Sequence, residues 1–150
     1  MRSTNSPLHW PAETWAILSL RLFLGFRFLL TGFGKFAEGV GGYLNGFVAG
    51  TVAEFAEKTW IPGFLVYPYC VALGPVQILL GAAVLLGIKT RVALGLTALT
   101  YFSLAFGKMA MHEHDSVVGI GTQFLIAIVA LCLVRFNRFA LVQDSEPATR

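Results

Sequence analysis

Two arginines, Arg21 and Arg27, stand inside an apolar run that extends from residue 15 to residue 34. An arginine near the centre of a membrane span costs roughly 2.5–3.5 kcal/mol, so such a side chain usually faces the protein interior and has a partner. The apolar runs of this chain contain no Asp or Glu, and the polar side chains other than the two arginines, such as Gln77 and Gln123, are neutral. A buried guanidinium among neutral acceptors suits an anion, a carbonyl-bearing ligand such as a quinone, or a carboxylate of a partner subunit. The alternative is that the arginines extend to the membrane surface.

Glycines accompany these polar residues at helical spacing. The series from Arg21 to Lys35 advances by 4, 3, 4 and 3 residues, which places its members on one face of a helix. Glycines on such a face let another helix or a flat ligand approach the backbone. Helix packing accounts for the glycines, but it does not account for the arginines and glutamines. The candidate ligand-binding residues are therefore Arg21, Gly25, Arg27, Gly32, Lys35, Gln77 and Gln123.

A polar turn at residues 108–115 contains His112 and His114, together with two methionines. Imidazole beside a carboxylate can transfer protons to a quinone headgroup, so these histidines are the candidate catalytic residues. An ordinary solvated turn has a similar composition. We expect no metal site, because such sites need three or four converging ligands, and no haem or iron–sulfur ligand set is evident. The two cysteines, Cys70 and Cys132, are far apart and are interpreted as buried apolar residues.

Four apolar runs, at residues 15–34, 68–88, 92–107 and 117–134, must position these side chains. Their lengths are close to the roughly 20 residues that a membrane-spanning helix needs. Together the four runs predict an all-α, four-helix transmembrane bundle. The first run lacks a cleavage site and is expected to be retained. Residues 35–67 are too polar to span and predict an interfacial outer loop with a short amphipathic helix near residues 52–60. Residues 1–14 and 136–150 are polar terminal segments.

The composition supports a lipid environment, with 56% hydrophobic and 13% charged residues. Soluble domains have roughly 45–50% apolar and 25% charged residues. The basic residues are scattered beside apolar runs, so we expect no nucleic-acid partner. Four spans place both termini on the same side of the membrane. Lysine and arginine are more frequent beside the run ends on that side than on the other, which predicts that both termini are cytoplasmic. Membrane lipid is the expected surrounding.

The series from Arg21 through Gly25 and Gly32 to Lys35, the segment from Gly81 to Gly87 and the following Lys-Thr-Arg resemble the DoxX/DoxD-like membrane family. The resemblance covers about residues 21–135, and the outer loop is more like the DoxD branch, the small subunit of thiosulfate:quinone oxidoreductase. It implies a bacterial or archaeal cytoplasmic (inner) membrane and an association with a redox enzyme. By position the resemblance implies a structural or functional role for Arg21, Gly25, Gly32, Lys35, Gly81, Gly87 and Arg91. Gln77 stands where the family often has an acidic residue.

Three functions are compatible with these features. The first is a membrane subunit of a quinone-linked oxidoreductase, which receives electrons through an obligatory protein partner and is not expected to be catalytic alone. The second is a non-catalytic scaffold or assembly factor whose buried arginine meets a carboxylate of another protein or of a second copy in a homo-oligomer. The third is a small-anion carrier or channel that uses the region of Arg27. The interior cations favour the quinone-linked subunit.

Overall fold

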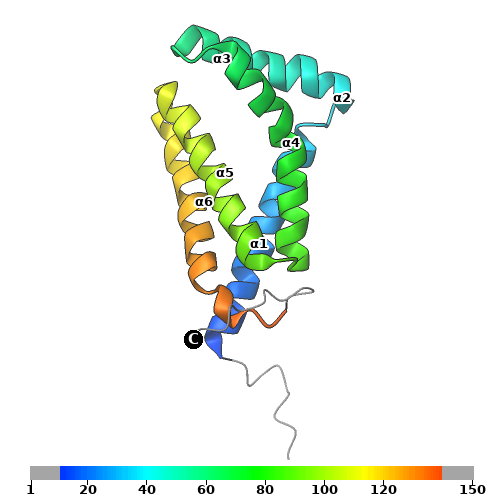
Figure 1. The fold of residues 1–150 in the computed structure, drawn as a ribbon, viewed down its shortest axis with the longest axis vertical. Coiled ribbons are helices and arrows are strands. Elements are labelled where there is room, and N and C mark those ends of the chain that lie inside the picture. Colours follow the sequence, from blue (N-terminus) through cyan, green and yellow to red (C-terminus); the bar gives the residue numbers. More distant parts are fainter. Residues whose placement is uncertain (1–10, 140–150) are drawn as a thin grey trace, which may run out of the picture.

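The computed structural model of the chain describes residues 11–139, which form a bundle of long helices with a further helix across one end (Figure 1). The predicted all-α four-helix bundle is confirmed. We call the end that holds residues 11 and 139 the terminal end, and the opposite end the loop end. The elements are α1 (Ala12–Gly34), α2 (Gly39–Gly42), a π-helix (Tyr43–Val48), α3 (Ala49–Lys58), α4 (Gly63–Leu86), α5 (Thr90–Ala110), α6 (His114–Cys132) and a 3₁₀ turn (Val134–Phe136).

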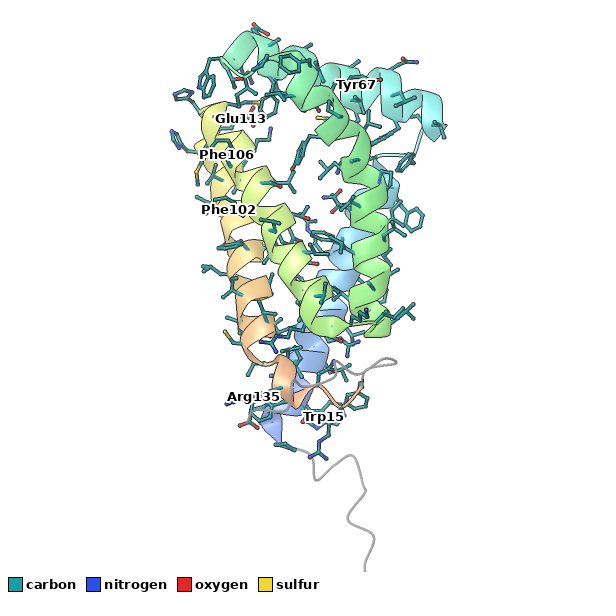
Figure 2. All side chains as sticks on the ribbon, viewed as in Figure 1. Trp15, Tyr67, Phe102, Phe106, Glu113 and Arg135 are labelled. Atoms are coloured by element: carbon teal, nitrogen blue, oxygen red, sulfur yellow. The ribbon has the colours of Figure 1, made fainter. Side chains whose placement is uncertain are left out.

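All four long helices expose large apolar side chains on their outer faces. One leucine from each illustrates this: Leu30 is 71% exposed, Leu79 69%, Leu99 61% and Leu125 62%. Within residues 11–139, these four helices are long and apolar enough to cross a membrane. Exposed apolar side chains on every long helix are stable only against lipid, so the chain is a multi-pass membrane protein. Figure 2 shows Trp15 and Arg135 at the terminal end, and Tyr67 and Glu113 at the loop end.

The helices are longer than the apolar runs of the sequence. The second span begins at Gly63 and not at about residue 68, because Pro68 is accommodated inside the helix near its start. The third and fourth spans extend into the polar turn predicted at residues 108–115 and leave a connection of only three residues, 111–113. The helix predicted near residues 52–60 begins earlier: α2, the π-helix and α3 follow one another without a gap from Gly39 to Lys58, and we call them together the surface helix.

Close contact of α1 with α4 depends on glycines. A Cβ atom added to Gly25 would lie 3.0 Å from the carbonyl oxygen of Gly81, and one added to Gly81 would lie 2.8 Å from the backbone nitrogen of Leu29. A Cβ on Gly32 would meet Ile78 in the same way. Small residues let two helix backbones approach closely, which is the main source of packing energy between helices in lipid. The glycine face of α1 is therefore filled by α4.

The bundle consists of two pairs, α1 with α4 and α5 with α6, which lie close together at the terminal end and diverge toward the loop end (Figure 1). The main hydrophobic core lies in the terminal half, since its members belong to the terminal parts of the four helices. A second cluster lies at the loop end, between the surface helix and α4. The main core includes Ile17, Leu24, Phe28, Val84, Leu94, Tyr101 and Ala127, and the second cluster contains Tyr43, Val48, Val66 and Cys70.

Tyr43 fastens the surface helix to α4. Its hydroxyl accepts a hydrogen bond from the backbone N–H of Gly74 and donates to the carbonyls of Cys70 and Val71. In a regular helix the carbonyl of Val71 would accept from residue 75, but Pro75 has no N–H. The hydroxyl therefore satisfies the Val71 carbonyl, which the proline leaves without a helical donor, inside the membrane where water is not available to do so.

Candidate functional site

Arg21 is buried at the terminal end and makes four hydrogen bonds to protein acceptors. Its Nε donates to the carbonyl of Val84 (3.0 Å) and its Nη2 to that of Leu85 (3.1 Å), both in the last turn of α4. Its Nη1 donates to Oδ1 of Asn137 (2.6 Å) and to the carbonyl of Phe139 (3.1 Å). Carbonyls in the last turn of a helix lack intrahelical partners and carry partial negative charge, so a guanidinium is favourable there. The arrangement joins α1, α4 and the segment after α6.

Asn137 extends this connection to α5. Its Nδ2 donates to Oγ1 of Thr90, at the first position of α5, while its Oδ1 accepts from Arg21. The turn between α4 and α5 is closed by Gly87, which has a left-handed φ of 71° as the residue after the helix. Arg21 was a candidate ligand-binding residue. The structure places it outside the cavity described below, with four hydrogen bonds to the protein itself.

We predict that Arg21→Met destabilises the bundle, because Val84, Leu85 and Asn137 lose their donor in an apolar environment. Each orphaned group costs on the order of 1–3 kcal/mol. Arg21→Lys should recover only part of the loss, since one ammonium cannot reach the divergent acceptors as a guanidinium does. The measurement is thermal unfolding in detergent, and Arg27→Met, which removes a guanidinium from the same helix, should leave Tm nearly unchanged. Equal losses in the two methionine variants would contradict the role given to Arg21.

A cavity of about 220 Å³ lies where the two helix pairs begin to diverge. All four long helices line it, together with Phe47 of the π-helix. It brings together four of the candidate ligand-binding residues, namely Arg27, Lys35, Gln77 and Gln123. The remaining lining residues are Phe28, Thr31, Phe47, Leu73, Tyr101, Leu104, Gly119 and Ile120.

Two polar atoms at this cavity are buried without a hydrogen-bond partner. They are the hydroxyl of Tyr101, a residue that is 95% buried in an edge-to-face contact with Phe28, and Oε1 of Gln123. Buried polar groups are nearly always paired in folded proteins, and an unpaired one costs about 1–3 kcal/mol. Both residues line the cavity, Tyr101 from α5 and Gln123 from α6.

Two cations lie at the same cavity. Lys35 is half-buried; its Nζ donates to Oε1 of Gln77 (2.9 Å) and to the carbonyl of Thr31 (3.4 Å), and it lies 4.9 Å from the ring centroid of Phe47. Arg27 is exposed, and its guanidinium makes no hydrogen bond or ion pair with any residue from 11 to 139. No carboxylate belongs to the part of the lining that the structure describes. Within the described lining, the two positive charges therefore meet only neutral groups.

The other candidates lie elsewhere. Gly25 and Gly32 face α4, in the glycine contact described above. His112 and His114 border a shallow hollow at the loop-end surface and are not among the residues that line the cavity. His112 has a φ of 60°, and the backbone N–H of the next residue, Glu113, donates to the carbonyl of Lys108. His112 thus occupies the left-handed position that ends α5, a place usually taken by glycine.

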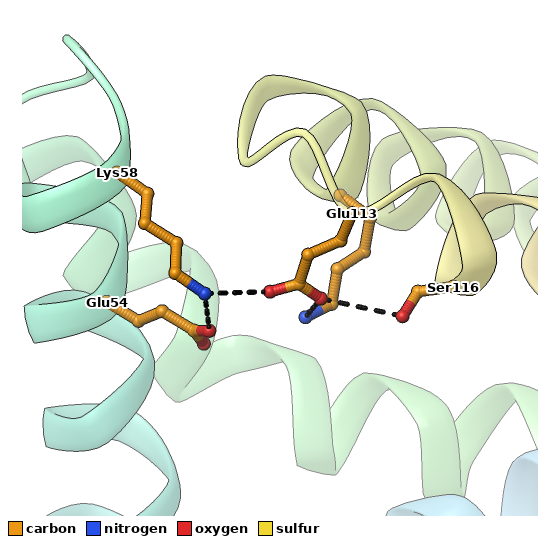
Figure 3. A network of polar contacts seen from close by, with 5 residues as sticks. Glu54, Lys58, Glu113 and Ser116 are labelled. Atoms are coloured by element: carbon orange, nitrogen blue, oxygen red, sulfur yellow. Dashed lines mark hydrogen bonds and ion pairs between the residues drawn. The ribbon is translucent and has the colours of Figure 1, made fainter.

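The loop end is closed by a network of charges that we call the latch: Glu54, Lys58, Lys108 and Glu113 (Figure 3). Nζ of Lys58, on α3, lies 3.1 Å from one carboxylate oxygen of Glu113, and Nζ of Lys108 lies 2.6 Å from the other. Lys58 also pairs with Glu54 one turn away. The latch joins the surface helix to the turn between α5 and α6, bridging the two diverging pairs.

The charges shift each other's titration. Hydrogen bonds from Lys108 and then Lys58 lower the pKa of Glu113 from 4.5 to about 2. The hydrogen bond that Lys58 donates to Glu54, and to a smaller extent the one that it donates to Glu113, raise the pKa of Lys58. A carboxylate whose pKa is lower in the folded state stabilises it above its ordinary pKa and stops doing so as the pH falls toward the lowered value. The contribution of Glu113 is therefore complete above pH 4.5 and is lost toward pH 2.

We predict that acid opens the latch. Spin labels at residues 57 and 114, in a variant without the native cysteines, should report one narrow distance distribution at pH 7 and a broader, longer one near pH 2. Glu113→Gln should broaden the distribution already at pH 7, whereas Asp115→Asn, a neighbouring carboxylate without a described ion pair, should not. A narrow distribution for Glu113→Gln at pH 7 would show that the ion pairs do not hold α3.

Some of these residues carry no distinctive signal in the sequence. Asn137 contacts Arg21 from 116 residues away, and nothing in the local pattern indicates that contact. Tyr101 is one of several hydroxyl-bearing residues on the third span, and only its burial without a partner sets it apart. Comparison of the chain with protein-family models, with curated proteins and with solved structures finds no match in any of the three. The chemistry of the cavity is therefore argued from its own residues.

Proposed function

We propose that this chain is a membrane subunit that binds a quinone headgroup in the cavity between the two helix pairs and serves a quinone-linked oxidoreductase. The observation that carries the proposal is the meeting of Arg27, Lys35, Gln77, Gln123 and the unpartnered Tyr101 hydroxyl at one membrane-embedded cavity. The resemblance of the first span to the DoxX/DoxD-like family supports it. We place the protein in a bacterial or archaeal cytoplasmic membrane with both termini cytoplasmic, and we assign electron supply to a partner protein.

The size and lining of the cavity suit one substituted ring. A cavity of about 150 Å³ already holds a benzene molecule, whereas drug-sized ligands need roughly 300–1,000 Å³. The volume of about 220 Å³ lies between the two. Phe28, Leu73, Leu104 and Ile120 supply apolar contacts for the faces and edges of a ring. A headgroup of one or two rings is therefore the appropriate ligand class, with its tail in the surrounding lipid.

The polar groups have complementary roles toward such a ring. The Tyr101 hydroxyl donates to a carbonyl oxygen of the oxidised form, and Oε1 of Gln123 accepts from a hydroxyl of the reduced form. Arg27 and Lys35 favour electron density on the ring oxygens, because charges act strongly where water is excluded. Proton exchange with His112 or His114 would require a connection from the cavity to the loop-end surface. The quinone supplies the redox chemistry, and these side chains bind and orient it.

One observation also favours the second function, a scaffold. The exposed guanidinium of Arg27 has no partner within residues 11–139, so it is available to a carboxylate of another protein or of a second copy of this chain. Native mass spectrometry of the protein extracted gently from its own membranes separates the two functions. A protein partner retained without bound quinone supports the scaffold, and bound quinone lost in Arg27→Gln supports the proposed function.

We predict that the purified protein binds a short-chain ubiquinone and that Arg27→Gln weakens this binding. A charge-assisted hydrogen bond contributes roughly 1.5–3 kcal/mol, so its loss should raise Kd about 10- to 100-fold. The measurement is titration in nanodiscs, followed by quenching of intrinsic fluorescence. Arg135→Gln is the matched control, because Arg135 is an exposed arginine at the terminal end that stacks on Phe136. Equal Kd values for the two variants, or no binding by the unmodified protein, would contradict the proposal.

A further inference from the structure

The cavity has a charge imbalance that a neutral quinone does not resolve. Arg27 and Lys35 lie eight residues apart on the helical stretch that ends α1, about 12 Å along its axis, with Thr31 midway between them. All three line the cavity, and no described carboxylate does. The partners of Lys35 are neutral groups, and the exposed guanidinium of Arg27 has no partner within residues 11–139. A cation within a membrane span normally has a counter-charge or another polar partner. The missing component of the site is therefore an anion.

The lining also restricts the kind of anion. A small inorganic oxyanion would contact the two cations but would leave Phe28, Leu104 and Ile120 facing unfilled space. A lipid phosphate stays at the membrane interface. Gln123 lies about 14 Å along α6 from its loop-end start, close to the middle of a hydrocarbon core of about 30 Å. The ligand must therefore carry its charge on an apolar ring that reaches this depth.

We infer that the cavity selects ring compounds that carry an ionised oxygen, such as acidic hydroxyquinones and phenolates, over neutral quinones of the same size. The juxtaposition of Arg27 and Lys35 with the buried Tyr101 hydroxyl, in a lining without a described carboxylate, carries the inference. It rests on the proposed function, because it concerns the ligand of the same cavity. Two cations and one unpartnered hydroxyl belong to the lining of this cavity. A hydrogen bond from either cation to an ionised ring oxygen is charge-assisted, and such bonds are about twice as strong as neutral ones.

Two naphthoquinones of nearly equal size test this selectivity. The probe 2-hydroxy-1,4-naphthoquinone is an acidic enol that is ionised at neutral pH, and 2-methoxy-1,4-naphthoquinone cannot ionise. We expect the unmodified protein, in phosphatidylcholine nanodiscs at pH 7, to bind the hydroxy compound at least about tenfold more tightly. Arg27→Gln should abolish this preference, Arg27→Lys should retain most of it, and Arg135→Gln should leave it unchanged. Thermal unfolding confirms that each variant is folded.

The outcomes separate the inference from the proposed function. Equal affinity for the two probes overturns the inference and leaves the quinone site standing, whereas failure to bind either probe overturns both. Displacement of the hydroxy compound by millimolar sulfate would identify a site for inorganic anions and overturn the inference. Anionic phosphatidylglycerol can also replace part of the phosphatidylcholine. If this displaces the hydroxy compound, the cavity is a lipid-phosphate site and the inference is overturned. A preference that persists in Arg27→Gln would show that the two-cation arrangement is not its cause.

Discussion

The guanidinium of Arg21 is the interaction on which the arrangement of the helices depends. It joins α1 to the last turn of α4 and to the segment after α6, and Asn137 carries the connection on to α5. These contacts hold all four helices together at the terminal end, beside the main hydrophobic core. Inside a membrane the helix-end carbonyls need protein donors, and one arginine with five N–H groups supplies several of them at once.

Because the helices are fixed at the terminal end, the two pairs can diverge toward the loop end without separating. Tyr43 fastens the surface helix to α4, and the latch fastens the same helix to the turn between α5 and α6. The surface helix thereby bridges the gap between the pairs. The cavity lies between these two closures, at the depth where the main core ends. Its lining includes polar groups that the described part of the fold leaves without partners: the Arg27 guanidinium, the Tyr101 hydroxyl and Oε1 of Gln123.

The four spans could be predicted from the sequence, because the length and composition of apolar runs are dictated by the bilayer. The sequence also identified Arg27, Lys35, Gln77 and Gln123 as candidate ligand-binding residues, and the structure places them at one cavity. The role of Arg21 could not be predicted, since its partners are helix-end carbonyls and residues 137 and 139. The helix through the glycine-rich residues 39–50 was equally unforeseen, because packing of Tyr43 and Val48 against α4 outweighs the low helix propensity of glycine.

The central claim is that a ring-shaped ligand occupies the cavity between the helix pairs, and covalent labelling tests it most directly. A photoreactive azido-quinone would be activated on the protein in native membranes, and the labelled residues would be located by peptide mass spectrometry. We predict labels on the cavity wall that α5 and α6 form, at residues 101–104 and 119–123, that disappear when excess unlabelled quinone is present. Labels confined to lipid-facing residues such as Leu79, Leu99 and Leu125, and unaffected by that excess, would contradict it.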